Sequence, residues 1–540
     1  MAGTYTYKSP AYNSPSTKQS KDGSATGKNR IYQVFEKTFE LDELSIPAET
    51  TGDQSENLQN RASLQYPVIK INDYMINQGE IDSMEIDCKD WIPKITLKCT
   101  FIHQTFLTRE MPKDGDIISI AIRNKSDLLK SVRNDYVITG VVSTENTTQF
   151  LGPTSMTFYG VLFIPWLSSG QLDLSFEGTS FETLKDLSKK IGLGFATNED
   201  NTDDKQIWIA GYHYTTAEFI NSVSKRIWRD EKSFYDIWID IYYNLNFINV
   251  NKQLMSSEDE VDLAGWINNI DKEYVWGNDA EQSKVIETPK VLSNYDGYRT
   301  TSFYINSWRP INKATNITFE CGTRIQCNMF EHNDKLYSNE EAKQYWSFPI
   351  DPAYDPAKVN KYILLRGRAK QYADLKGKDQ AKANYSYTDM YVKYPWSGIQ
   401  YTISNPNDES SQWDGNVHKN YLRAKIQNLI NNKELEKLNV EVTVNGINLN
   451  IIKGDKTPIV LVRKDIVENR MINKDSGDLD MLEEFYSGWL YVKGFTIKYN
   501  KENDDTIMSN FTQTFILTRR EWPPPIAVDA INPTENKTTT

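Results

Sequence analysis

The sequence is poor in the residues that carry most redox, metal and nucleophilic chemistry. Its 540 residues include four cysteines, Cys88, Cys99, Cys321 and Cys327, and four histidines, His103, His213, His332 and His418. The cysteine spacings fit neither a zinc ribbon nor a Cys-x-x-Cys redox site. No HExxH, G-x-S-x-G or phosphate-loop motif occurs. We therefore expect no cofactor, no metal and no catalytic residues, with cysteines and histidines in ordinary structural positions.

Long apolar runs and a basic excess are also missing. No segment approaches the roughly 18 apolar residues of a membrane span, and the polar N-terminus does not read as a secretory signal. The net charge is −12, which argues against a chain-wide basic surface for nucleic acid. These absences predict a protein that is made in the cytoplasm and has no membrane partner.

What the chain does contain is β-favouring. Aromatic residues make up 12% of it, including 31 Tyr and 13 Trp, beside many Thr, Ile and Val. The length allows three or four domains. The fold class we expect is α+β and mainly β, with two tube-protein-like β-barrel domains, an α/β module and a large irregular insertion.

The order of these parts follows from shifts in composition along the chain. We expect a flexible N-terminal arm at 1–62, a first β-barrel at 63–165, an α/β module with an acidic loop at 166–295, β segments with an irregular insertion and a helix at 296–434, a second β-barrel at 435–528, and a polar tail at 529–540. The arm and the tail are rich in Ser, Thr, Asn and Lys, a composition typical of segments without a core of their own.

Capping-box spacings predict three helices in the α/β module. The pairs are Thr179 with Glu182, Thr215 with Glu218, and Ser233 with Asp236. Gly192 and Gly194 would end the first helix. After the third, "NFINVNKQL" is expected to return to a strand.

Further signals lie in the C-terminal half. A helix is expected at 417–435, with Tyr421, Ile426, Leu429 and Ile430 on one face. The following run "NVEVTVNGIN" alternates with period two and carries an Asn-Gly hairpin signal.

The acidic run "NEDNTDD" at 198–204 is the best candidate for a cation. Taking Asp200 as position one of a calcium loop puts Lys205 where a glycine is needed. We therefore favour a solvated loop over a calcium site.

The most informative feature is a repeat. "QTFLTREMP" at 104–112 returns as "QTFILTRREWP" at 513–523, and each copy follows a run that is typical of a strand. The second copy has one more residue, Ile516, so we expect a β-bulge just before Leu517 if the two strands superpose. Chance similarity and a duplicate without special role remain open beside our preferred interpretation, an internal duplication of a β domain.

The duplication supplies the candidate interface. The expected contact residues are Gln104, Phe106, Arg109 and Glu110 in the first copy, and Gln513, Phe515, Arg519, Arg520 and Glu521 in the second. Two related domains per chain would give a homotrimer six similar domains in a ring, which lets a threefold object join a sixfold one.

Several segments resemble the central baseplate hub proteins of contractile-tailed bacteriophages of the T-even type. They are "MPKDGDIISIAIRN…DYVITGVV", "SFETLKDLSKKIGLGF", "FYDIWIDIYYNLNFINVN", "LNVEVTVNGINLNIIKGDKTPIVLV" and "GWLYVKGFTIKYN…FTQTFILTRREWP". The resemblance covers about 65–260 and 435–525; the long arm and the insertion depart from it. It implies a non-enzymatic homotrimer in the virion, assembled in the host cytoplasm. It also implies two tube-like barrels per chain, and as partners the tail tube protein, the central spike protein and neighbouring baseplate proteins.

In such a hub, DNA would be met only as it passes through the lumen, and like charge on the lumen wall would let it slide. Two other classes of function stay open on the residues alone. One is a carbohydrate- or receptor-binding tail component with an aromatic groove in 300–430; the other is a glycan-degrading tail enzyme with two facing carboxylates. The hub of a non-viral contractile injection system is a variant of the structural hypothesis.

Overall fold

The computed structural model describes the chain in separate stretches. Side chains are described over most of 31–42, 67–101, 112–122, 130–144, 153–167, 175–210, 214–230, 232–254, 292–294, 304–312, 438–461, 486–501 and 510–519, with isolated positions between 418 and 435 and at 44 and 483. Strands at 5–7, 322–330, 345–348 and 385–393 are described by their backbone, as is most of the strand at 44–46.

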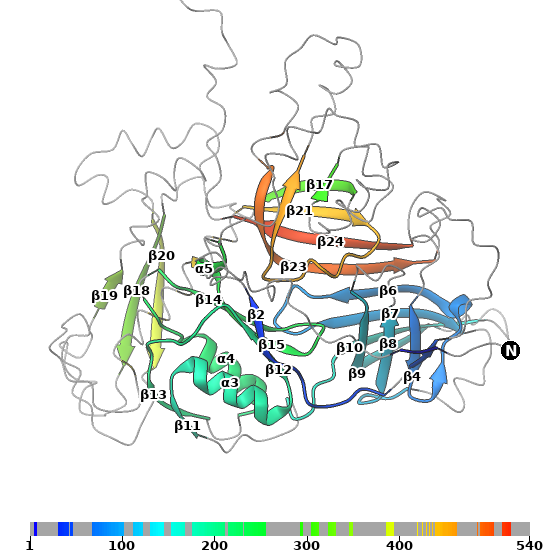
Figure 1. Ribbon diagram of the computed structural model, residues 1–540, viewed down its shortest axis with the longest axis horizontal. Coiled ribbons are helices and arrows are strands. Elements are labelled where there is room, and N and C mark those ends of the chain that lie inside the picture. The colour runs from blue at the N-terminus through cyan, green and yellow to red at the C-terminus, as the bar shows by residue number, and fades with distance from the viewer. Residues whose placement is uncertain are drawn as a thin grey trace, which may run out of the picture.

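The fold is α+β and mainly β, and most of it is one 13-stranded sheet (Figure 1). Its first half comprises β4 (Val68–Ile71), β5 (Tyr74–Met75), β6 (Ile81–Asp87), β7 (Lys94–Phe101), β8 (Ile117–Ile122), β9 (Val132–Thr144) and β10 (Thr154–Leu162). Its second half comprises β16 (Leu292–Ser293), β17 (Ile305–Asn312), β21 (Leu438–Asn445), β22 (Lys456–Val460), β23 (Gly488–Asn500) and β24 (Phe511–Thr518). The order along its main path is β17-β21-β24-β23-β6-β7-β10-β9-β8-β4-β5.

The two halves meet where β6 pairs with β23. The antiparallel register runs from Asp87 opposite Thr496 to Ser83 opposite Asn500. The two β regions expected as separate barrels therefore share one sheet in the described residues. Its second half also takes in β17, from the segment expected to be an insertion, and β16, from the expected α/β module.

The halves are arranged alike on either side of this junction. Each starts with an antiparallel hairpin, β6–β7 or β23–β24, whose first strand carries a bulge, at Asp82 in β6 and at Lys493 in β23. Two further antiparallel strands follow outward, β10 and β9 in one half, β21 and β17 in the other. The chain order differs, because β9 and β10 follow their hairpin whereas β17 and β21 precede theirs. This likeness is what an internal duplication with permuted connections would leave.

The α/β module follows β10 along the chain. Its elements are β11 (Ser175–Gly178), α3 (Ser180–Ile191), β12 (Gly194–Thr197), β13 (Gln206–Ile209), α4 (Thr216–Ser224), β14 (Tyr235–Ile239), β15 (Asn244–Asn249) and α5 (Val250–Leu254). A four-stranded sheet has the order β14-β15-β12-β2, and its last strand, β2 (Tyr32–Phe35), comes from the N-terminal arm. That part of the expected flexible arm is thus a strand of the module.

Two of the three expected helices are confirmed. Thr179 and Thr215 cap α3 and α4, and each capping box is complete on both sides. Gly192 ends α3 in the left-handed conformation, at φ 80°.

The third helix, expected from Ser233, is wrong: β14 and β15 form a hairpin there. Asp240 and Tyr243 make its turn, with φ 63° at Tyr243 and a hydrogen bond from the Tyr243 amide to the Asp240 carbonyl. The strand expected through 254 ends at Asn249, where α5 begins.

Two expectations for the C-terminal half also need correction. β21 ends at Asn445 and Gly446 has φ 82°, but β21 pairs with β17 and β24 instead of forming an Asn-Gly hairpin with the next strand. The segment expected to be irregular holds β19 (Tyr345–Phe348) and β20 (Tyr385–Lys393), which join β18 (Gly322–Phe330) in a small sheet. Another small sheet pairs β1 (Tyr5–Tyr7) with β3 (Leu44–Ile46).

In the expected helix at 417–435, the helical positions that are described include Ala424, Asn428, Asn431 and Leu435, all buried. Their spacing of three and four residues marks the inner face of that helix. The residues named for its apolar stripe lie outside the described residues.

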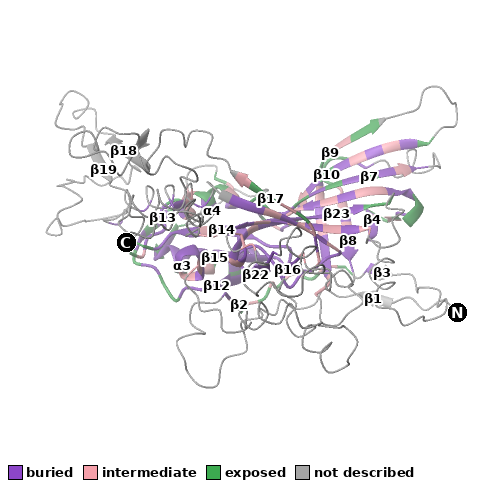
Figure 2. Cartoon of the chain, turned by 90° about the horizontal axis from the view of Figure 1, so that it is seen from above, coloured by how far each residue is buried: buried purple, intermediate pink, exposed green. Residues whose placement is uncertain are grey.

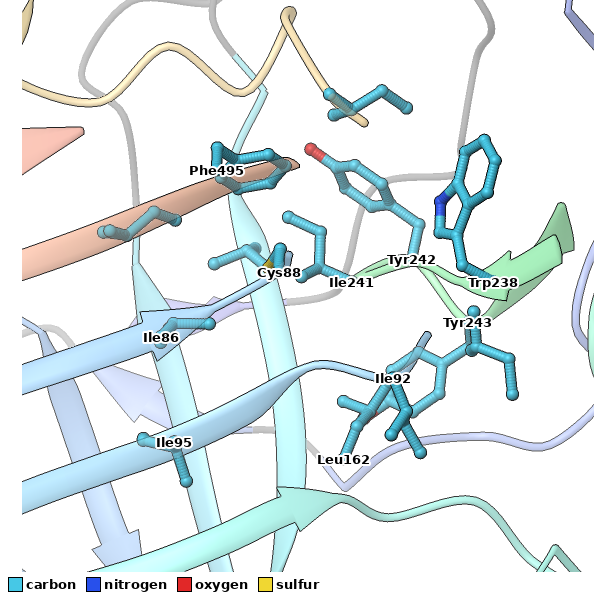
Figure 3. Close-up of a cluster of buried hydrophobic side chains, with 14 of the residues drawn as sticks. Ile86, Cys88, Ile92, Ile95, Leu162, Trp238, Ile241, Tyr242, Tyr243 and Phe495 are labelled. Carbon is cyan, nitrogen blue, oxygen red and sulfur yellow. The ribbon is translucent and has the colours of Figure 1, made fainter. Parts of the chain in front are cut away.

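One hydrophobic core connects these parts. It contains residues of both halves of the sheet and of the α/β module (Figure 2). At the point where all three meet, Cys88 of the first half and Phe495 of the second lie near Trp238, Ile241 and Tyr242 of the module (Figure 3). The Cys88 amide donates to the Phe495 carbonyl at 2.9 Å. The module and the two half-sheets are therefore packed as one body.

Candidate interaction surface

The large sheet has one buried and one exposed face. In β7, Ile95, Leu97 and Cys99 are buried, whereas the alternating residues Lys94, Thr96 and Lys98 are exposed. This alternation is the period-two pattern of a strand with one face on the core. β10 and β24 alternate in the same way, so the exposed face is continuous across the junction of the halves.

The exposed face is largely polar and includes ion pairs between neighbouring strands. Lys498 Nζ lies 3.2 Å from Glu85 Oε2 across the junction, and Arg309 Nη2 lies 2.8 Å from Glu441 Oε1 near the far edge. Hydroxyl side chains fill positions between them.

Besides the short strands β5 and β16, two stretches of the sheet have an edge with no partner strand among the described residues. β9 is covered by β8 only along Val132–Val137, and Ile138 bonds to Gly115 and Asp116. The remaining stretch, Thr139–Thr144, pairs with β10 alone. At the opposite end, Ile305–Asn312 of β17 pairs with β21 alone. We call these stretches the β9 edge and the β17 edge; unpaired main-chain groups of this kind are templates for another strand.

The interface residues expected from the sequence are not brought together here. Gln104, Phe106, Arg109, Glu110, Arg520 and Glu521 lie outside the described residues. Gln513 and Phe515 are fully buried in β24, so their proposed place at an interface is wrong. Gln513 Oε1 accepts a 2.7 Å hydrogen bond from the Asn448 amide, which makes it part of the core.

Arg519 also has an internal role. Its Nη1 donates to the Ser487 carbonyl at 3.0 Å. Burial lowers the pKa of its guanidinium to about 10. The bond ties the end of β24 to the start of β23.

The bulge expected just before Leu517 is also wrong. β24 pairs without interruption to β21, from Val440 opposite Leu517 to Asn445 opposite Thr512. The irregularity lies in the neighbouring β23, at Lys493. The second "QTF" starts two residues after the first residue of β24, whereas the first starts ten residues after the first residue of β7. The repeated letters therefore stand at different distances from the first residues of β7 and β24, so they do not mark equivalent positions of these two strands.

The acidic run at 198–204 is a loop that is only partly solvated, because Asp200 and Asp203 are exposed whereas Glu199 and Asp204 are buried. Glu199 is completely buried, where Arg229 Nη1 and Lys252 Nζ pair with its Oε2 and Asn249 donates to its Oε1. Asp204 is buried as well and accepts from the amides of Ser180 and Trp228 at 2.9 and 3.0 Å. Burial raises the pKa of Asp204. These acids hold the module together.

The other chemistry-bearing groups that are described are structural too. Cys88 and Cys99 are free and buried, and burial raises the pKa of both thiols. His418 lies against the Arg226 carbonyl, 3.0 Å from its Nε2. Within the described residues, no group of three His, Cys, Asp or Glu side chains could hold a metal, and no helix is long and apolar enough to cross a membrane.

No protein-family model and no curated protein matches the sequence. Solved structures do resemble the fold. A tail protein from Neisseria meningitidis aligns over 85% of this chain and 98% of its own, at 9% identity and a TM-score of 0.41. A 43 kDa prophage tail protein from Shewanella oneidensis aligns over 84% of this chain and 98% of its own, also at 9% identity and a TM-score of 0.41. The third is the Escherichia coli c3393 protein, a type VI secretion component described as similar to T4 tail proteins gp27 and gp5. It aligns over 85% of this chain and 79% of its own, at 8% identity and a TM-score of 0.35.

Proposed function

We propose that the protein is a structural, non-enzymatic tail hub, a homotrimer that joins a sixfold tail tube to a threefold central spike. The observation that carries this proposal is the run of eight strands from the β9 edge to the β17 edge, four in each of two similarly arranged half-sheets. A trimer of this chain presents six such half-sheets around its axis, two from each copy.

The direction of the strands favours closure into a ring. Every neighbouring pair from β9 to β17 is antiparallel. With eight antiparallel strands, the first and the last run in opposite directions. The β9 edge of one copy can therefore pair with the β17 edge of the next in the same antiparallel pattern, and a head-to-tail contact of this kind closes into a ring.

The exposed face suits the wall of such a ring. Ion pairs and hydroxyl groups lie on it, so we expect DNA that passes through the lumen to be held only weakly. The tail tube protein and the neighbouring baseplate proteins would meet the rims of the ring, and the spike protein its threefold end. The protein would be assembled in the host cytoplasm and would then be part of the virion tail.

The test is the mass and shape of the purified protein. Mass photometry should give three times the 62.3 kDa of one chain, and negative-stain images should show a threefold ring. Val142→Lys, which puts a charge on the β9 edge, should weaken assembly. Thr157→Lys is the matched control, because Thr157 lies opposite Val142 on β10, inside the sheet. A chain that stays monomeric at micromolar concentration, with or without tube or spike protein, would overturn the proposal.

A further inference from the structure

Trp166 is the most exposed large apolar residue that the structure describes. Its side chain is 68% exposed and its backbone has φ 64°, in the left-handed region that a bulky residue avoids. A strained backbone persists only where its surroundings fix it, and such positions gather at functional sites. The combination of strain and exposure calls for a reason outside the isolated chain.

The turn that carries Trp166 is firmly held. The Leu167 amide donates to the Ile164 carbonyl at 3.3 Å, so Pro165 and Trp166 are the central residues of a type II turn. This turn type favours glycine at the position of Trp166. The Thr216 hydroxyl donates to the Trp166 carbonyl at 2.9 Å, and Ile164 and Leu167 are buried on either side. These contacts therefore hold the backbone of Trp166 in a fixed conformation while its indole is exposed.

The other two non-glycine residues with positive φ in the described part of the chain have internal reasons for it. Asn72 is a residue type that tolerates this conformation, and its side chain accepts from the Ile117 amide at 3.3 Å. Tyr243 is fully buried and its hydroxyl accepts from the Asp135 amide at 2.8 Å. Among the described residues Trp166 finds no comparable burial, and a partner would account for an indole there.

Exposed apolar side chains connect this turn to the β9 edge. Of the nine exposed large apolar residues that the structure describes, four lie between β9 and the turn: Val142 on β9, Tyr159 on β10, Phe163 directly after β10, and Trp166 in the turn. Phe163 follows β10 directly, and its amide donates to the Asp135 carbonyl of β9 at 2.8 Å. The β9 edge begins four residues beyond Asp135, roughly 13 Å along the strand. A subunit seated on that edge is therefore within reach of the turn.

We propose that Trp166 is the anchor by which each copy of the chain holds its neighbour in the ring. The occupant is a second copy, because the β9 edge beside the turn needs a strand of opposite direction and the β17 edge of this chain supplies one. This inference rests on the proposed function. Rigid, exposed Trp residues dominate the affinity of many interfaces, and preorganisation reduces the entropy lost on binding.

The experiment compares Trp166→Gly with the wild-type chain, by mass photometry over a dilution series and by thermal unfolding. Glycine relieves the turn, so the variant should unfold at the same temperature or higher, yet its trimer should dissociate at a roughly thirtyfold higher concentration. Trp166→Phe should keep most of the assembly. Ile209→Ala, which removes another exposed apolar side chain (53%) on β13, should leave assembly unchanged.

A trimer as tight in Trp166→Gly as in the wild type would overturn the role of Trp166 and leave the proposed function standing. A wild-type chain that never assembles would overturn both. A weakened Ile209→Ala trimer would show that loss of exposed apolar surface in general, and not this turn, controls assembly.

Discussion

Lys453 lies over the indole of Trp238, with its Nζ 4.8 Å from the ring centroid. The same ammonium group reaches the carbonyls of Lys89 and Asp90 at 3.3 and 3.4 Å and the carboxylate of Asp236 at 3.4 Å. One side chain from the connection between β21 and β22 therefore contacts the connection between β6 and β7 and the α/β module at once. This junction sets the position of each half-sheet relative to the other.

Gly454→Ala should destabilise the protein strongly. Gly454 has φ 91°, and a methyl group there would lie 2.6 Å from the Trp238 ring. We expect a loss of roughly 2–4 kcal/mol in the free energy of unfolding, from backbone strain and overpacking together. Urea unfolding followed by Trp fluorescence measures it. Gly79→Ala, where nothing lies within 4 Å, is the control and should be near neutral.

Lys453→Met should cost about 1–3 kcal/mol, because it keeps the aliphatic stem but removes a nearly buried charge with three oxygen partners. Lys498→Met breaks a pair of similar length, to Glu85, whose side chains are 46% and 40% exposed. The latter change should cost less than about 1 kcal/mol. Equal losses in the free energy of unfolding of the two variants would mean that Lys453 stabilises the protein no more than an exposed ion pair does.

The parts of the fold that follow from short-range signals were predictable from the sequence. The caps of α3 and α4 are examples, since Thr179 and Thr215 bond to residues three positions away. Ser233 has the same spacing to Asp236 but begins a hairpin. The strands β14 and β15 are almost wholly buried, so their apolar residues do not alternate and hydrophobic periodicity cannot separate them from a helix. A period-two signal was present in Asn244 and Asn246, which both donate to Asp240.

The parts that were missed depend on distant partners. The β6–β23 junction joins residues about four hundred positions apart, and no local pattern encodes that pairing. Glu199 is buried because Arg229 and Lys252 are brought to it by the fold. One property of the sequence does relate to the β9 edge. β9 has 13 residues and β8 has six, so β8 cannot pair with the whole length of β9. The repeated "QTF", in contrast, suggested Gln513 and Phe515 as interface residues, whereas the structure places both in the core.

Glu199→Gln should destabilise the α/β module by about 3 kcal/mol, because an amide nitrogen would then face donors that now meet a carboxylate. Because Arg229 and Lys252 are 34% and 22% exposed, water can relieve part of the loss. Asp73→Asn is the control, since Asp73 is 99% exposed beside Lys70 and should change stability by less than about 0.5 kcal/mol. A neutral Glu199→Gln would contradict the buried network and would return the acidic run to the status of a surface loop.

His418 should make the protein sensitive to mild acid. Burial lowers the pKa of its imidazole from 6.5 to about 3. Between these values the unfolded chain binds a proton that the folded chain does not, so stability is fully present above pH 6.5 and is lost as the pH falls toward 3. At pH 5 the loss is about 2 kcal/mol relative to neutral pH. His418→Gln, which keeps a donor for the Arg226 carbonyl, should lose about 2 kcal/mol less than the wild type between pH 7 and pH 5 in matched urea titrations. Parallel losses in the two proteins would show that other groups control the acid response.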